Sequence, residues 1–275
     1  MQYELKNRAL VRISGADAEE FLQNQLSNDI SKLEDTKIQF NAYCQHQGKI
    51  ITLLWVMRSK DSFLLSFPID LLEKVVARLQ MYVIMSDVLI EDVSESFLQI
   101  GLLDEIHKNG YLINQRMSLL IQSSKRDTEV IMNHQDEWTK ACIESGIPEI
   151  YLSTSEKLVP QMLNLDINEF GVNFSKGCYP GQEVVARLHY LGEAKRRLFS
   201  FTSESEMQVG DNLYCASSKA AIVRGDRYKG SGIVVNKVKY NSIFYCLATL
   251  DLDLLSDKIT LNNEHGPILN KINNE

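Results

Sequence analysis

The chain has 275 residues, of which 44% are hydrophobic and 24% are charged, and its formal net charge is −7. This length can bury the core of one large domain or of two ordinary ones, and the composition excludes collagen-like, linker-like and disordered chains. The negative net charge argues against a protein that binds a nucleic acid over most of its surface. We therefore expect an ordinary globular protein, and nucleic acid is not its expected direct partner.

The cysteines, histidines and apolar stretches restrict the environment of the chain. Five widely spaced cysteines do not resemble a disulfide framework, and the scattered histidines predict no bound metal; the cysteines are Cys44, Cys142, Cys178, Cys215 and Cys246. The most apolar stretch, residues 50–57, is far shorter than the roughly 18 residues of a membrane span. The first residues show no signal or transit pattern. We expect reduced thiols, no membrane contact and a cytoplasmic location.

Strand and helix patterns alternate over the first 103 residues. The run 9–13 is typical of a strand, and Gly15 leads into a helix with Phe21, Leu22 and Leu26 on one face. Further strands are expected at residues 38–42, 49–57, 62–67, 87–93 and 96–103, with a second helix at 72–83. The predicted order is βαβββαββ.

The second half changes character near residue 197. A helix is expected over residues 134–145, because Gly146 and Pro148 follow it as stop signals, and another over 182–190. Beyond residue 197 the patterns are those of strands alone, at residues 198–201, 221–223, 232–238 and 243–250. This change predicts two parts, an α+β region at 1–196 and an all-β region at 197–275.

The most informative stretch is KGCYPGQE, residues 176–183. Cys178 precedes a predicted helix and stands two residues from Lys176, and both the positive end of a helix and an ammonium group favour the reactive thiolate. Gly177 and Gly181 allow close approach of the backbone, and the turn amides suit an anionic group. The alternative is a loop cysteine that only packs, and these features alone leave both open.

The run KGCYPGQEVVAR closely resembles the KGCYxGQE signature of the YgfZ family of folate-binding proteins, which are relatives of the glycine cleavage T-protein, an aminomethyltransferase. Members of this family support iron–sulfur enzymes and the thiomethylation of tRNA. Five other segments resemble the family in the same order: ISGADAEEFLQNQLSNDI at 13–30, QGKI at 47–50, IESGIP at 143–148, VPQMLNLD at 159–166 and AKRRL at 194–198. The resemblance covers nearly the whole chain.

The resemblance implies an α+β, aminomethyltransferase-like folate-binding fold. In this fold, α+β subdomains form a ring around a central channel of folate size, and a β-barrel follows at the C-terminus. Residues 1–196 would then form two intertwined subdomains that bind folate, and residues 197–275 would form the barrel. The strand-only pattern after residue 197 agrees with this assignment.

The resemblance also implies a residue that stacks on folate. Trp138 matches a tryptophan that bacterial members place beside folate. Its neighbours on the same helical face, Ala141, Cys142 and Ser145, are small and would leave room for a flat ring. The alternative is that Trp138 is an ordinary core residue.

Polar contacts to folate are expected at further positions. Glu144 matches an acidic position of the family, and a carboxylate can accept two parallel hydrogen bonds from the edge of a pterin; otherwise Glu144 is a solvated charge at a helix end. Cys142 replaces an Arg or Asn of the family, and Arg8 stands where many members have a second aromatic residue. The remaining contacts are expected at Tyr179, Gln182, Glu183 and Arg187.

Basic residues gather near the motif, and acidic residues are missing where the enzymes of the wider family have them. Lys195, Arg196 and Arg197, with Lys176 and Arg187, form a cluster that is either a solvated face or a site for the glutamate tail of folate, a phosphate or a partner. The T-protein relatives carry acidic residues just after their glycine turn, where this chain has Thr52 and Leu53. A carboxylate near the reacting amine is needed for aminomethyl transfer, so its absence argues against that reaction.

The leading hypothesis is an accessory protein that binds tetrahydrofolate or another reduced folate. It would use Cys178, with Lys176 as the nearby cation, to maintain iron–sulfur enzymes such as those that thiomethylate tRNA. A folate-dependent one-carbon transferase or demethylase is the alternative enzyme, and an interaction scaffold with a vestigial pocket is the third hypothesis.

Overall fold

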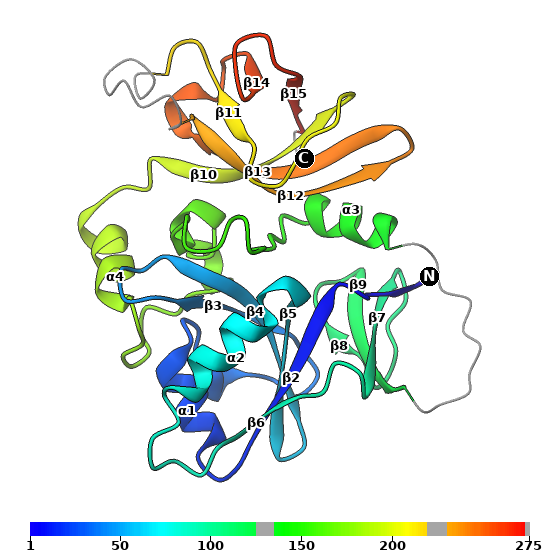
Figure 1. Ribbon diagram of the computed structural model, residues 1–275, viewed down its shortest axis with the longest axis vertical. Helices are drawn as coiled ribbons and strands as arrows, with labels where there is room; N and C mark the ends of the chain where they lie inside the picture. The colour runs from blue at the N-terminus through cyan, green and yellow to red at the C-terminus, as the bar shows by residue number, and fades with distance from the viewer. Residues whose placement is uncertain (125–134, 219–229, 273–275) are drawn as a thin grey trace.

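The computed structural model describes residues 1–124, 135–218 and 230–272. Three β-structures organise this part of the chain: a five-stranded sheet, a four-stranded sheet and a closed six-stranded barrel. In Figure 1 the barrel lies above the two sheets, and helix α3 (Asp136–Glu144) lies in the layer between them. The predicted α+β class with a C-terminal β-barrel is confirmed.

The five-stranded sheet has the order β3-β4-β5-β2-β6. Its strands are β2 (Arg8–Ser14), β3 (Gln39–Cys44), β4 (Ile50–Ser59), β5 (Ser62–Pro68) and β6 (Leu89–Asp92). One face is covered by α1 (Ala18–Gln25) and α2 (Leu72–Gln80). Both faces are buried, so β4 is almost continuously apolar, and alternate residues of β2 enter different cores: Val11 packs toward the helices and Leu10 toward the second sheet.

The four-stranded sheet joins the N-terminus to a later part of the chain. Its order is β1-β7-β9-β8, with β1 (Gln2–Glu4), β7 (Phe97–Leu103), β8 (Tyr111–Leu112) and β9 (Met117–Ser123). Tyr3 of β1 pairs with Gly101 of β7. The chain therefore starts in this sheet, crosses to the five-stranded sheet at Arg8, and returns after β6.

The barrel has the strand order β10-β13-β12-β11-β14-β15. Its strands are β10 (Arg196–Ser203), β11 (Asn212–Tyr214), β12 (Gly232–Tyr240), β13 (Ile243–Asp251), β14 (Ile259–Leu261) and β15 (Ile268–Lys271). The register of β12 against β13 shifts between Val234 and Asn236. Val234 packs in the barrel core; because one extra residue reverses the alternation of side chains, Asn236 faces α3 and the sheets.

Some elements differ from the sequence predictions. Strands β1, β8, β11, β14 and β15 were not predicted, since two to four residues are too few to show an alternation. Strand β9 was also missed, and α3 begins at Asp136. His134 and the strand predicted at residues 221–223 lie outside the described residues. No helix of residues 1–124, 135–218 or 230–272 has the length and apolar character needed to cross a membrane.

Candidate functional site

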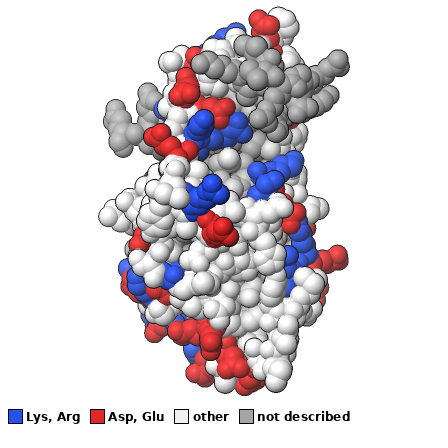
Figure 2. All heavy atoms as spheres, turned by 90° about the vertical axis from the view of Figure 1, so that its left-hand side faces the viewer, with Lys and Arg blue, Asp and Glu red and all other residues white. Residues whose placement is uncertain are grey.

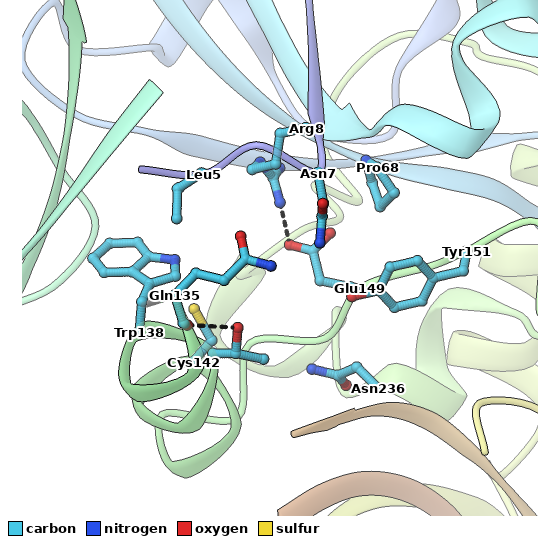
Figure 3. Close-up of a pocket in the computed structure, with 11 residues that line it drawn as sticks. Leu5, Asn7, Arg8, Pro68, Gln135, Trp138, Cys142, Glu149, Tyr151 and Asn236 are labelled. Atoms are coloured by element: carbon cyan, nitrogen blue, oxygen red, sulfur yellow. Dashed lines mark hydrogen bonds and ion pairs between the residues drawn. The ribbon is translucent and has the colours of Figure 1, made fainter. Parts of the chain in front are cut away.

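A pocket lies where the junction of the two sheets, α3 and barrel strand β12 meet (Figure 3). We call it the central pocket. It is lined by Leu5, Asn7, Arg8, Pro68, Gln135, Trp138, Thr139, Cys142, Glu149, Tyr151 and Asn236. It is narrow, with a volume of about 60 Å³. The side chain of Gln135 lies between Trp138 and Glu149 in this space (Figure 3).

Arg8 and Glu149 form a buried ion pair in the wall of the central pocket. Arg8 Nη1 lies 2.5 Å from Glu149 Oε1, and the two side chains are 8% and 10% exposed. Arg8 Nε donates to Ser66 Oγ at 2.8 Å, and Nη2 donates to the Ser66 carbonyl at 3.0 Å. The guanidinium also lies 3.9 Å from the ring centre of Trp55. Arg8 is therefore held on all sides and fixes the position of Glu149.

Three buried polar atoms of the central pocket have no hydrogen-bond partner among the described residues. They are Oε2 of Glu149 and both Oδ1 and Nδ2 of Asn236. Burial raises the pKa of the Glu149 carboxyl, although the Arg8 guanidinium opposes this rise. Proteins keep few buried polar atoms without a partner because each is costly. Three such atoms around one pocket are typical of a site that receives polar groups of a ligand.

Trp138 lines the central pocket, but its indole is packed more tightly than its helical neighbours suggest. Trp138 is 3% exposed, and a Cβ built on Gly101 would lie 2.6 Å from its Cδ2 atom. The Tyr3 ring centre is 6.5 Å from that of Trp138. Cys142 lies on the same helical face and also lines the pocket. The indole thus packs on Gly101 and still contributes to the pocket wall.

Glu144 does not line the central pocket. It ends α3, where its side chain is 42% exposed and its Oε1 atom lies 2.5 Å from Lys140 Nζ. The carboxylate in the pocket is Glu149, which sequence reasoning did not identify. In the sequence, Glu149 is the one charged residue in the run IPEI, residues 147–150. All four of these residues are buried in the structure. Glutamate is almost never fully buried unless it is paired.

Lys176 anchors the motif loop, which we define as residues 176–181. Its Nζ atom donates to the carbonyls of Gln23 at 2.6 Å, Leu26 at 2.5 Å and Asn28 at 3.0 Å. Carbonyls at the end of a helix carry partial negative charge, which suits an ammonium. Burial lowers the pKa of Lys176 to about 8. All three donors of the ammonium are in use, so Lys176 holds the loop against the end of α1.

Cys178 is the exposed cysteine of the chain; Cys44, Cys142, Cys215 and Cys246 are buried. Its neighbour Tyr179 is buried, and burial raises the pKa of that phenol. Gln182, the first residue of α4 (Gln182–Leu191), donates from Nε2 to the Gly177 carbonyl at 3.4 Å. A thiol reacts only with groups that can reach it. Cys178 is therefore the thiol available to a partner.

The motif residues and the central pocket occupy different regions of the described structure. None of the following lines the central pocket: Lys176, Cys178, Tyr179, Gln182, Glu183 and Arg187. In Figure 1, α4 and α3 lie at opposite sides of the layer below the barrel. The structure thus brings Arg8 and Trp138 together and leaves Glu144 and the motif residues outside that group.

Gly181 packs the motif loop against the turn between β3 and β4. Its φ is +84°, and a Cβ at this position would lie 2.5 Å from the Gln45 carbonyl oxygen and 2.7 Å from Gly48 Cα. We expect Gly181→Ala to lower the free energy of unfolding by about 1–2 kcal/mol or more, from the left-handed backbone and the clash. Denaturant titration measures this. Gly177→Ala is the control, because nothing lies within 4 Å there; we expect a change of about 0.5 kcal/mol or less, and equal losses would contradict the packing argument.

Two of the five residues of the basic cluster form ion pairs. Arg196 Nε lies 2.7 Å from Asp251 Oδ1, and Arg197 Nη1 lies 2.5 Å from Asp166 Oδ1. Lys176 is buried, whereas Arg187 and Lys195 are exposed. On the face that carries α4, positive and negative side chains alternate between wide uncharged areas (Figure 2). Arg196 and Arg197 therefore hold barrel strand β10 through ion pairs with Asp251 and Asp166.

Among the described residues, neither a carboxylate directly after the glycine turn nor a cluster of metal ligands is present. Thr52 and Leu53 are fully buried within β4. In the part of the chain that the structure describes, no three side chains of His, Cys, Asp or Glu come together as a metal site. The carboxylate of the central pocket is thus supplied by Glu149, far along the chain from the glycine turn.

Comparisons with known proteins agree with this architecture. Residues 3–103 match the family model of the GCVT N-terminal domain. An uncharacterized protein of Haemophilus influenzae is 28% identical, over 90% of this chain and 88% of its own length. Proteins named tRNA-modifying protein YgfZ are 26% identical in Blochmanniella pennsylvanica, over 87% of this chain and 84% of the relative, and 27% identical in Escherichia coli O157:H7, over 86% and 80%.

A solved structure shares the fold. The glycine cleavage system aminomethyltransferase T from Bartonella henselae superposes with a TM-score of 0.69, at 11% identity, over 99% of this chain and 84% of that chain. This confirms the aminomethyltransferase-like fold. The resemblance carried by the KGCYPGQE motif is confirmed as well: the chain is similar over most of its length to proteins named tRNA-modifying protein YgfZ, and residues 3–103 match the GCVT N-terminal domain.

Proposed function

We propose that this protein binds a reduced folate in the central pocket and supports, through Cys178, the iron–sulfur enzymes that thiomethylate tRNA in the cytoplasm. The observation that carries the folate part is the central pocket itself, which combines an indole with three unpartnered buried polar atoms. The names of the YgfZ relatives support the part that concerns tRNA modification.

The residues of the central pocket suit the chemistry of folate. Trp138 offers an aromatic surface beside the pterin, and Glu149 and Asn236 offer polar atoms to its edge. Small-molecule sites usually have about 300–1,000 Å³, so a pterin would need the space that the Gln135 side chain fills between Trp138 and Glu149. When bound, a reduced folate supplies a carrier for one-carbon groups.

The part assigned to Cys178 depends on its exposure. A sulfur that serves a partner protein must be accessible, and the other four cysteines are buried. Lys176 and Gly181 hold the motif loop in place by contacts to α1 and to the turn at Gly48. We propose that these contacts present the thiol at a defined position on the surface.

Calorimetric titration with tetrahydrofolate tests the folate part directly. We expect Trp138→Ala to raise the dissociation constant by several-fold to tenfold, because an aromatic contact contributes on the order of 1 kcal/mol beyond the buried area. Trp138→Phe keeps a ring on Gly101 and should retain most of the affinity and the fold. An unchanged constant in a folded Trp138→Ala protein would remove Trp138 from the site.

A one-carbon transferase or demethylase is the second candidate function, and Glu149 is the observation that favours it. A buried carboxyl with a raised pKa in a pocket can act as a general acid or base. Turnover of a methylamine substrate with tetrahydrofolate would establish this function. Failure to bind any reduced folate would favour a scaffold with a vestigial pocket.

A further inference from the structure

We infer that Glu149 and Asn236 together select the ligand of the central pocket, and that they select a ring whose edge carries N–H donors next to a carbonyl, such as the 2-amino-4-oxo edge of a pterin. This inference rests on the proposed binding of folate. It goes further in naming the atoms that would contact the ring. Glu149 and Asn236, which carry these atoms, are 87 positions apart in the sequence.

Glu149 is a pure acceptor in this arrangement. Its Oε1 atom accepts from Arg8 Nη1, and its Oε2 atom is buried without a partner among the described residues. An ionised carboxylate offers only lone pairs. The group that meets Oε2 must therefore bring N–H or O–H donors, and a carbonyl at the same place would be repelled.

Asn236 supplies the complementary half. Its Oδ1 and Nδ2 atoms both lack partners among the described residues, and the residue is 0% exposed. The shifted register between Val234 and Asn236 turns this amide out of the barrel core, where Val234 packs. An amide that both donates and accepts matches a ring edge with a carbonyl beside an N–H.

Arg8 acts as a positioning residue for this pair. Its contacts to Ser66 and its place over Trp55 hold the guanidinium, which in turn holds one oxygen of Glu149. Figure 3 shows Glu149 and Asn236 on one side of Gln135, with Trp138 on the other. A flat ring in place of the Gln135 side chain would have the indole on one side and the two polar groups on the other.

The test compares two pteridines on the full-length protein by calorimetric or fluorescence titration. Pterin carries the 2-amino group, whereas lumazine carries a carbonyl at that position. We expect the wild-type protein to bind pterin at least about tenfold more tightly, because sites built to hydrogen-bond a donor reject analogues that lack it. Glu149→Gln should lose this preference, because its amide can donate to the second carbonyl. Glu144→Gln, an exposed carboxylate on the same segment, should keep it.

Asn236→Leu provides a separate readout. Removing an unpartnered buried amide should leave the thermal midpoint unchanged or raised, while the affinity for pterin falls about tenfold. If Asn236 only stabilised the fold, Asn236→Leu would instead lower the thermal midpoint. Equal binding of pterin and lumazine by a wild-type protein that binds tetrahydrofolate would overturn this inference alone. Absence of binding for all three compounds would overturn the proposed folate function along with it.

Discussion

Replacement of Cys178 by serine is expected to reduce tRNA thiomethylation to the background of cells that lack the protein. Serine keeps the size and hydrogen bonding of the side chain but removes the thiolate, which is the nucleophile and metal ligand. Because Cys178 is exposed and the other four cysteines are buried, no second thiol is placed to substitute for it. Mass spectrometry of digested tRNA from complemented cells measures the effect.

Two controls distinguish the effect of losing the Cys178 thiol from an effect on the motif loop. The purified Cys178→Ser protein should keep the wild-type affinity for tetrahydrofolate and its stability, since the side chain is exposed and lies outside the central pocket. Cys215→Ser, at a buried cysteine of the barrel, should support thiomethylation wherever the protein folds. Full restoration by Cys178→Ser would mean that the motif acts through its backbone geometry.

Replacement of Arg8 by methionine is expected to destabilise the protein by about 3–5 kcal/mol, which is the usual cost of leaving one member of a buried ion pair alone. Methionine fills much of the same volume but leaves the Glu149 carboxylate without its cation. The loss also removes two hydrogen bonds to Ser66. Urea titration of the variant and the wild type at neutral pH measures the difference.

The loss in Arg8→Met should depend on pH with a defined sign. The pKa of Glu149 in the folded chain is raised by burial above its ordinary value of 4.5. Between the unfolded and folded pKa values the folded state binds more protons, so the free energy of unfolding falls as pH rises. Without Arg8 this pKa rises further, and the loss of stability should extend to higher pH. Stability of Arg8→Met that is independent of pH above 4.5 would contradict this argument.

The double variant Arg8→Met with Glu149→Gln should recover most of the lost stability. Its buried pair no longer contains an uncompensated charge, and exchanging a whole buried ion pair for neutral groups is often nearly neutral. With the wild type and the Glu149→Gln single variant, these two variants complete a double-mutant cycle that gives the coupling energy of Arg8 and Glu149. A double variant as unstable as Arg8→Met would assign the effect to the Ser66 hydrogen bonds.

The elements that surround the site were largely predictable from the sequence. Apolar alternation and helical spacing predicted β2 to β5, α1, α2 and α4, because these patterns depend only on which face of one element is buried. The motif KGCYPGQE predicted a glycine-bounded turn at the start of α4, where Gly181 has a positive φ. Trp138 was identified by the family resemblance, with the small residues on its helical face as support, and it lines the central pocket.

The polar half of the central pocket was not predictable. Glu144 and Glu149 stand five positions apart in one segment, and nothing local decides which carboxylate faces the pocket. That choice follows from the path of the chain after α3, where Gly146 has a φ of +68° and residues 147–150 become buried. A helix end leaves Glu144 beside Lys140, whereas the buried run brings Glu149 to Arg8.

The sequence by itself determined the fold class, through motifs in family order along the chain, and the strand-only C-terminal part, through alternation within single segments. Only the tertiary structure decided which polar groups meet. Arg8 and Glu149 are 141 positions apart and form a hydrogen bond, and Asn236 lines the same pocket because of the shifted register in β12. Such contacts arise from the packing of whole sheets against a barrel, which no local pattern encodes.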